Sequence, residues 1–456
     1  MRFILLPFLG LLGTGLLVAA QAHAQDLPAP GARVPRVAEN PKPTEPPSPL
    51  GLEAAIHWAV EHHPAIRRAR SQVDERKGKA LQADRWFPED AELAVKGDIR
   101  STVDNGESDI SVRLGQPLWI AGQGQFLASA ARARVRGAER HQAYTHALVT
   151  ARTRQAFLQA LVAQEAVRMV QRTVRRTRDF RSALLRGPEE LSPMARNAVD
   201  VAAHRVQAAL VRMKRRQEHA RLALLEQLAL PPDVNLEIRG RLAAPPLQLP
   251  ERETLMKAAL RRRQDLAEVA QEVVAEREDL KLARRRRIPN PTIYWAYSVE
   301  SGDRQSRLGV SFPFSLRRFQ RGSRQAAAEQ VTQAEVSQEA LRLTIRRQVH
   351  EAITDYRAAR QLVDILRERT YRKAAESLDQ ALRRFRAGSM GPGDITATLD
   401  NLMTVRQEHI EALQELVAAG TALEQATGGL LVMGQYPSSQ AENRSTLVSH
   451  GKGDEE

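Results

Sequence analysis

The sequence contains no cysteine, and this absence excludes several kinds of site at once. Disulfide bonds, thiolate zinc sites, iron–sulfur clusters and a lipid-modified N-terminal cysteine all require that residue. Aromatic residues are scarce at 4%, whereas charged residues make up 27% of the 456 residues. Long helices rich in alanine, arginine, glutamate and glutamine have such a composition, and a compact β-sandwich usually does not.

Motifs for catalysis or ligand binding are missing as well. The sequence has neither a GxxxxGK[ST] phosphate-binding loop nor an HExxH zinc motif, and no nucleophile–base pair stands out. His62 and His63 are adjacent, and His141 and His146 lie five positions apart, so neither pair suits shared ligation of a metal. We therefore predict no enzymatic activity, no cofactor and no metal site, and we interpret the histidines as solvated.

The net charge of +14 makes nucleic acid or another anionic surface a candidate partner. Residues 1–24, however, have the pattern of a signal peptide: Arg2, an apolar run from Phe3 to Ala20, and the cleavage sequence Ala22-His23-Ala24. The alternative is a retained membrane anchor, because the run nearly reaches the ~18 apolar residues of a transmembrane helix. Export without cysteine favours a bacterial periplasm or outer membrane and argues against a nucleic-acid partner.

Between a proline-rich segment at 25–50 and a polar segment at 435–456, the chain repeats one layout. The first segment predicts an extended periplasmic linker, and the second predicts a disordered C-terminal tail. His63-Pro64-Ala65-Ile66 precedes Phe87-Pro88-Glu89-Asp90 by the distance at which Gln264-Asp265-Leu266-Ala267 precedes Ile288-Pro289-Asn290-Pro291. Each pair is followed by two alternating segments and a long helical pattern. We therefore predict two structural repeats, at 51–248 and 249–434.

Each repeat contains a predicted β-hairpin, at 91–119 and at 292–316. Apolar residues alternate with polar ones, which is a strand pattern, and strands of roughly 10–12 residues can cross a bilayer when tilted. The alternative is a soluble hairpin with one buried face. Because the chain carries a signal peptide and has aromatic residues near strand ends, we interpret the apolar face as lipid-facing. Its members are Leu93, Val95, Ile99, Ile110, Val112, Leu114, Ile293, Trp295, Tyr297, Val299, Leu308, Val310 and Phe312.

Four strands are too few to close a barrel, because the smallest known barrels have about eight. Unpaired backbone at a sheet edge is not tolerated in lipid. The strand count therefore predicts an oligomer in which other copies of the chain pair with the edges.

Two very long helices are predicted, at 123–185 and 321–387, each spanning roughly 95–100 Å. In the second, apolar residues follow heptad spacing: Leu341, Ile345, Val349, Ala352, Tyr356, Ala359, Val363 and Leu366. Shorter helical patterns at 64–86 with 194–230, and at 265–287 with 394–427, add up to about the same lengths. This match predicts antiparallel rods capped by a β-hairpin, and the alternative is a bundle of unrelated helices.

The tips of the helical hairpins lie at 186–193 and 385–394. Gly187 and Pro188 turn the first tip, and Ser192 or Asp394 can N-cap the helix that follows. One interpretation is capping and turning only; the other is a contact surface or constriction. The arginine clusters are interpreted as solvated helix faces, with contact to anionic lipid headgroups as the alternative for residues 284–287.

Within this duplicated layout, Gln116-Pro117-Leu118-Trp119, Ile288-Pro289-Asn290-Pro291-Thr292-Ile293 and Gly309-Val310-Ser311-Phe312-Pro313-Phe314 with Arg321-Gly322 resemble the TolC-like outer-membrane efflux proteins. They look most like the branch that serves cobalt–zinc–cadmium resistance pumps. The resemblance covers about 51–434. It implies a mainly α fold with a small β part: a homotrimer whose long antiparallel α-helical hairpins form an α-barrel, and whose four strands per chain contribute to a shared 12-stranded transmembrane β-barrel.

The resemblance also implies a bacterial outer-membrane protein with a large periplasmic part. The function would be that of a passive exit duct for metal cations or small toxic compounds. Its partners would be a periplasmic adaptor protein, an inner-membrane proton-driven efflux pump and outer-membrane lipid, with no nucleic acid. The alternative is a periplasmic adaptor or a structural coiled-coil protein of an export complex.

The resemblance assigns one possible gate. In relatives, the second tip often carries an aromatic residue, a glycine three positions on, and an aspartate that lines the closed entrance. Phe385, Gly388 and Asp394 stand at matching offsets, whereas Met390 and Ala397 depart from the pattern. A single ring of Asp394 side chains is the resulting hypothesis, with helix capping as the alternative.

Overall fold

The computed structural model describes residues 46–101, 106–185, 192–240, 249–300, 303–313, 321–366, 370–387 and 389–429. The predicted signal peptide, most of the predicted linker and the predicted tail lie outside these ranges. The chain divides into two units, Met1–Pro47 and Ser48–Glu456. Nearly all of the described residues belong to the second unit, and the following paragraphs concern that unit alone.

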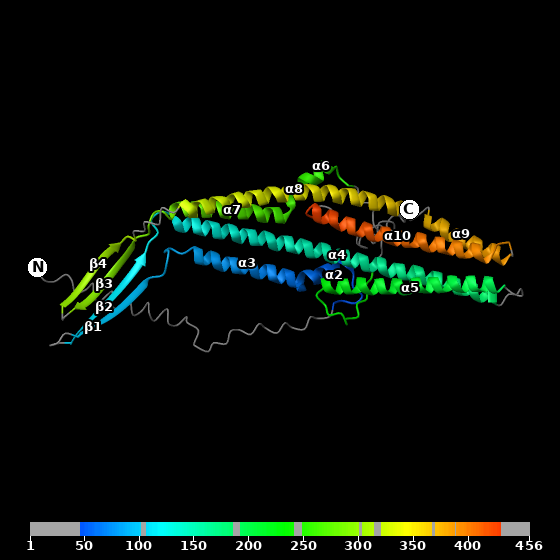
Figure 1. Ribbon diagram of the computed structural model, residues 1–456, viewed down its shortest axis with the longest axis horizontal. Coiled ribbons are helices and arrows are strands. Elements are labelled where there is room, and N and C mark those ends of the chain that lie inside the picture. The colour runs from blue at the N-terminus through cyan, green and yellow to red at the C-terminus, as the bar shows by residue number, and fades with distance from the viewer. Residues whose placement is uncertain are drawn as a thin grey trace, which may run out of the picture. The chain divides into compact units, whose positions relative to one another are not determined.

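The order of helices and strands in the first half recurs in the second (Figure 1). The first half contains α2 (Leu52–His62), α3 (Pro64–Ala83), β1 (Glu92–Ser101), β2 (Gly106–Pro117), α4 (Gln123–Leu185) and α5 (Pro193–Gln227). The second contains α6 (Arg252–Arg262), α7 (Gln264–Arg285), β3 (Thr292–Glu300), β4 (Asp303–Ser311), α8 (Arg321–Ile365), α9 (Tyr371–Arg386) and α10 (Pro392–Ala426). The boundary predicted between the repeats at 248 and 249 adjoins residues that are not described.

A single extended residue separates the first two helices of each half. His63 has φ −65° and ψ 127°, and Arg263 has φ −64° and ψ 120°. Pro64 disfavours helical geometry at His63, because its ring clashes with the preceding residue. No proline follows Arg263; instead its guanidinium is almost buried and donates to Asp265 (3.1 and 2.5 Å) and to Gln348 (2.6 Å). The same backbone bend is therefore held by different chemistry in the two halves.

The first long helix matches its prediction, since α4 runs unbroken for 63 residues, or roughly 95 Å. In the second long helical pattern, α8 ends at Ile365 and α9 begins at Tyr371, with π-helical geometry at Leu366 and Thr370. Residues 367–369 lie outside the described part of the chain, so one continuous helix over 321–387 stays a prediction. The interval contains no glycine or proline. At its end the Thr370 hydroxyl donates to the Ile365 carbonyl, five residues back, at 3.1 Å. Such a side-chain bond competes with the regular helical pattern.

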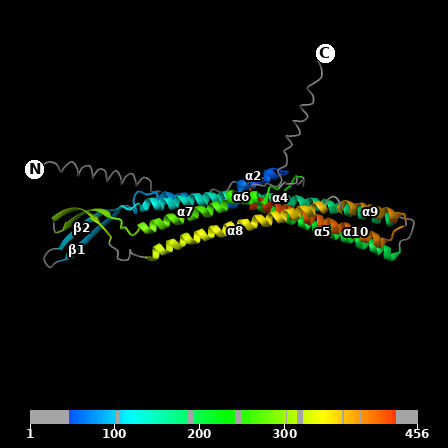
Figure 2. The same cartoon turned by 90° about the horizontal axis from the view of Figure 1, so that it is seen from above.

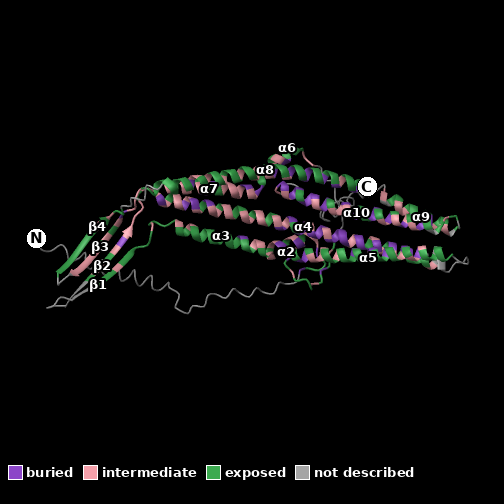
Figure 3. Ribbon diagram, in the orientation of Figure 1, coloured by how far each residue is buried: buried purple, intermediate pink, exposed green. Residues whose placement is uncertain are grey.

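The helices run side by side in both views, with the sheet at one end of them (Figures 1 and 2). α4 packs against α3 and α7 and also against α5 and α10, while α8 packs against α6, α7 and α10. The predicted heptad seam of α8 is confirmed, because the seven residues from Ile345 to Leu366 in that series are all less than 10% exposed. Figure 3 shows the buried residues concentrated where α4, α5, α8 and α10 lie together.

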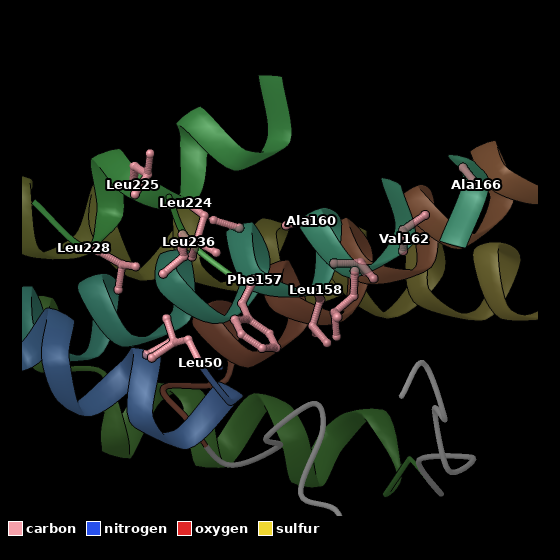
Figure 4. Packing of buried hydrophobic residues seen from close by; sticks show 14 of the residues in the cluster. Leu50, Phe157, Leu158, Ala160, Val162, Ala166, Leu224, Leu225, Leu228 and Leu236 are labelled. Atoms are coloured by element: carbon pink, nitrogen blue, oxygen red, sulfur yellow. The ribbon is translucent and has the colours of Figure 1, made fainter. Parts of the chain in front are cut away.

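The largest buried cluster joins the first half to the chain that precedes it (Figure 4). Phe157 of α4 and Leu224 of α5 are almost fully buried there, together with Leu50. The Leu50 amide donates to the Glu237 carbonyl at 2.7 Å. The Trp58 indole of α2 donates to the Leu228 carbonyl at 3.1 Å. These contacts tie both ends of the first half to the middle of α4.

α4 and α10 are also joined by a buried ion pair between Arg154 and Glu424. Removing one member of such a pair leaves the other charge buried, which typically costs 3–5 kcal/mol. Among the described helices, none combines the length and the apolar composition that a membrane-spanning helix needs.

Candidate functional site

The four strands form one antiparallel sheet in the order β1-β2-β3-β4. Leu93 pairs with Leu114, Leu114 with Trp295, and Trp295 with Leu308, so these residues form one row across all four strands. Val95, Val112 and Tyr297 form the next row, and Ile110 pairs with Val299 in a third. The register thus places the residues predicted to face lipid on one face of the sheet.

This face is apolar and exposed. The exposed fraction is 79% for Leu308, 65% for Val95 and 64% for Leu93. Phe312, just beyond β4, is 54% exposed, and Val112, Leu114, Tyr297 and Val299 are half-buried. The side chain of Ile99 lies outside what the structure describes. In the described part of the chain no helix packs against the sheet, whereas a soluble hairpin would have its apolar face covered.

The apolar rows end in polar residues toward the β3–β4 turn. Ser306 and Arg304 occupy the β4 positions that pair with Tyr297 and Val299, on the same face. The Trp295 indole donates to the Ser306 hydroxyl at 2.9 Å. The Trp295 ring also stacks on Tyr297, with ring centroids 6.2 Å apart. An aromatic residue with one apolar side and one satisfied polar atom suits a boundary between lipid and water.

The opposite face is polar and contains a packed aromatic residue. The Arg113 guanidinium lies 4.0 Å from the centre of the Tyr294 ring, a cation–π geometry. Tyr294 also lies over Gly309, where an added Cβ would come within 2.6 Å of the ring. Glycine at 309 is therefore required for the ring to lie across β4. Lys96, Gln305 and Arg307 share this face by register.

Hydrogen bonds from the start of α4 connect the first half of the chain to the second, close to the sheet. Gln123 is 1% exposed, and its amide nitrogen donates to Asn290 Oδ1 (3.0 Å) and to the Ile288 carbonyl (3.3 Å). The Leu118 amide donates to the Pro291 carbonyl at 2.8 Å. Sequence reasoning missed Gln123, because no local pattern marks a glutamine whose partners lie 165 and 167 residues away. The Gln-Pro-Leu and Ile-Pro-Asn-Pro motifs therefore meet in space.

At the hairpin tips, three of the predicted residues are described and three are not. Gly187, Pro188 and Gly388 lie outside the described residues. Ser192 directly precedes α5, and its carbonyl accepts from the Arg196 amide at 3.1 Å. Phe385 is half-buried and packs against the buried cluster of Val199, Ala381 and Ile395.

The prediction that Asp394 is the N-cap residue of the last helix is wrong. α10 begins at Pro392 with Gly391 as its N-cap, so Asp394 is the third helical residue. Its carboxylate is exposed and accepts from the Gly391 amide at 3.2 Å. Only this half of a capping box can form, because glycine has no side chain to reciprocate. Proline is favoured at the first helical position, which is why the helix starts two residues earlier than Asp394.

Ion pairs connect the two helical hairpins toward the tips. Arg176 of α4 pairs with Asp379 of α9 at 3.5 Å, and Arg205 of α5 pairs with Asp400 of α10 at 2.7 Å. Sequence reasoning missed these pairs, because their partners are far apart along the chain. All four side chains are substantially exposed, so each pair contributes at most about 1 kcal/mol.

Toward the sheet, α4 and α7 meet through a polar seam rather than an apolar one. Arg134 donates to Glu276 (2.9 Å) and to Asp279 (2.5 Å). Burial raises the pKa of the neighbouring Glu272, Arg134 lowers it in part, and a hydrogen bond with Glu276 raises it further, so that the pKa lies above its usual value. His141 lies 3.0 Å from Glu268 in the same seam.

The interpretation of the histidines as simply solvated needs correction at the α2–α3 bend. His62 stacks on Trp58 with ring centroids 4.1 Å apart. His63 Nδ1 accepts from the Ala65 amide at 3.1 Å and so caps α3. Burial, and then the charge of Arg152, lower the pKa of His63, which favours the neutral ring that this cap needs.

Comparisons with known proteins agree with this geometry. Residues 255–429 match the family model described as outer membrane efflux protein. The solved outer-membrane channel OprN has a TM-score of 0.72 at 17% identity, covering 83% of this chain and 90% of its own. CusC gives 0.68 at 16% (83% and 92% covered), and the CmeC outer membrane channel of Campylobacter jejuni gives 0.70 at 13% (86% and 89% covered). No curated protein matches the chain by sequence.

Proposed function

We propose that the chain is the passive exit duct of an efflux system, and the match of residues 255–429 to the family model of outer membrane efflux proteins supports this. The proposal rests on one observation: the sheet has an exposed apolar face and lies at one end of long helices. The duct has no chemistry of its own to perform. Its energy comes from a partner pump in the inner membrane, reached through a periplasmic adaptor that contacts the helical tips.

The edges of the sheet support assembly as a trimer. In the described part of the chain, β1 pairs only with β2, and β4 pairs only with β3. A lipid environment does not tolerate these free edges, so β1 of one copy pairs with β4 of the next. Three sheets of four strands make a closed barrel of twelve, with the apolar face toward lipid and the Arg113–Tyr294 face toward the water-filled interior.

Disulfide cross-linking tests the trimer, because the natural chain has no cysteine. Ala94→Cys on β1 is combined in turn with Gln305→Cys, Arg307→Cys and Ser311→Cys on β4, all on the polar face. Within one chain, three strand spacings of about 4.8 Å separate β1 from β4, which is beyond the reach of a disulfide. We expect one combination, fixed by the register between copies, to give covalent dimers and trimers in outer membranes.

The matched control is Ala94→Cys with Arg113→Cys, which are paired within one sheet and bond within the monomer. Cross-linked products larger than a trimer, or monomers from all three combinations while the control bonds normally, would reject the assembly. Conductance of the purified trimer in planar bilayers then tests the duct itself, and absence of any conductance would reject that function.

The cargo is metal cations or small toxic compounds. The motifs around Pro117 and Pro289 favour a metal-resistance branch, whereas the structural neighbours do not single out one branch. A deletion strain screened against divalent metals and against drugs separates the two cargoes. A periplasmic adaptor is the less favoured alternative, since two complete helix–strand–helix repeats exceed the single helical hairpin typical of adaptors.

A further inference from the structure

The two junctions at which helices pass into the sheet occupy equivalent places in the repeats but differ in chemistry. The first junction, between α3 and β1, is balanced in charge: Asp84 pairs with Arg132 and Arg85 with Asp90, both at 3.3 Å. It also exposes large aromatic side chains, with Trp86 89% and Phe87 45% exposed.

The second junction, between α7 and β3, carries four consecutive arginines, Arg284 to Arg287, all exposed. Arg284, Arg285 and Arg287 join Arg324 of α8 around a depression of ≈ 500 Å³. Its other lining residues are Leu280, Ile288, Gln325 and Ala328. No carboxylate lines it, and none of the four lining arginines forms an ion pair with a described residue. We refer to Arg284, Arg285, Arg287 and Arg324 as the arginine site.

Two acidic residues of α7 near the arginine site are already paired with other basic residues. Glu278 accepts from Lys281 at 2.7 Å, and Asp279 accepts from Arg134 at 2.5 Å. Glu329 is exposed on α8 but does not line the depression. The positive charge of the arginine site is therefore not neutralised by the part of the chain that the structure describes.

Stabilisation of helix ends does not account for the site. Basic side chains in the last turn of α7 oppose the negative end of the helix dipole favourably, and this explains Arg284 and Arg285. Arg324, however, lies in the first turn of α8, where the dipole disfavours a cation. Arg287 lies beyond the end of α7 and five positions before Thr292, where β3 begins.

The level of the site indicates what it binds. The apolar face of β3 starts at Ile293, so the arginines lie where lipid-facing residues give way to the helices. Trp86 and Phe87 mark the same level in the other repeat, and exposed tryptophan is typical of the membrane–water boundary. Guanidinium groups bind phosphate through two parallel hydrogen bonds, and basic residues at this depth attract anionic headgroups.

We propose that the arginine site binds the phosphate group of an anionic phospholipid in the leaflet that faces the helices. This proposal rests on the proposed function, because it needs the apolar face of the sheet to lie in the outer membrane. Ile288, which lies between the arginines and β3, supplies an apolar border for the glycerol and acyl ends of the lipid, which free phosphate does not need.

The test measures which lipids the full-length protein retains. Protein in a neutral maltoside detergent is equilibrated with equal amounts of phosphatidylglycerol and phosphatidylcholine, and the bound ratio is measured by native mass spectrometry. We expect enrichment of phosphatidylglycerol in the wild type and its loss in the Arg284→Gln/Arg287→Gln/Arg324→Gln variant. Each arginine removed should weaken the preference about fivefold.

The matched control is Arg212→Gln/Lys214→Gln/Arg215→Gln, which removes three exposed positive charges from α5 and should keep the enrichment. Equal lipid ratios in wild type and arginine-site variant would overturn the proposal. So would displacement of the lipid by millimolar inorganic phosphate, which would identify a site for free phosphate. Bilayer conductance of the same variants distinguishes failure of the lipid-site proposal from failure of the duct proposal, because the duct should still conduct when the lipid preference is lost.

Discussion

Leu308→Arg tests whether the apolar face lies in lipid. Leu308 is 79% exposed and lies on an edge strand, in a row with Trp295. If that face were in water, arginine would replace one exposed side chain with another, and the free energy of unfolding would change by about 0.5 kcal/mol or less. In lipid, arginine on the outer face of a transmembrane barrel costs about 2–4 kcal/mol near the middle of the bilayer.

The assay is equilibrium unfolding by guanidinium chloride of protein refolded into phospholipid vesicles, followed by tryptophan fluorescence. The control is Gln305→Arg, which places the same side chain on the same strand but on the polar face. We expect the midpoint to fall for Leu308→Arg and to stay near the wild-type value for Gln305→Arg. Equal midpoints for the two variants would refute the assignment of the apolar face to lipid, and a fall for Gln305→Arg alone would reverse it.

Three further substitutions test the interior of the sheet, the polar seam and the tip. Gly309→Ala should displace the Tyr294 ring and lower the unfolding temperature, whereas Gly97→Ala, where an added Cβ meets nothing within 4 Å, should not; equal effects would contradict the packing. The pKa of Glu272 is raised in the folded protein, so folding favours the protonated carboxyl. Its contribution to stability is therefore complete below the pKa of the unfolded chain and is lost as the pH rises through the pKa of the folded protein. Glu272→Gln should therefore raise the unfolding temperature at pH 8 but not at pH 4, and a pH-independent shift would count against this. Asp394→Asn keeps an acceptor for the Gly391 amide but removes the charge, so it should abolish block of conductance by divalent cations without loss of stability, and unchanged block would reject the ring.

The features that were predicted well from the sequence are those that depend on local patterns of residues close together in the chain. Alternation over 93–99 and 308–312 gives a face directly, and heptad spacing from Ile345 to Val363 gives the buried side of α8. The end of α8 at Ile365 was not predicted, because no glycine or proline marks it; the described bond from the Thr370 hydroxyl to the Ile365 carbonyl spans five residues, one more than in a regular α-helix.

The long-range polar contacts were beyond local patterns for a different reason. Gln123, Arg154 and Arg176 each find partners on another helix or in the other repeat, and nothing in their own neighbourhood distinguishes them from exposed residues of the same type. The N-terminus of α10 was misplaced because Asp394 is a good capping residue by type, yet Gly391-Pro392 starts the helix first.

The two repeats share their backbone arrangement but differ in the side chains at equivalent positions. The backbone bends alike at His63 and Arg263, and the strands and long helices recur in order, so the proposed trimer would present six similar backbone units. The side chains do not follow that symmetry: Asp84 is ion-paired near an exposed Trp86, whereas the arginines of the equivalent junction pair with no carboxylate among the described residues. Around the proposed trimer the junctions would then alternate between aromatic and basic, three of each. A contact that depends only on backbone geometry can occur six times, whereas a contact that depends on charge can occur only three times. Binding of anionic lipid at the arginine site should therefore saturate at three molecules per trimer.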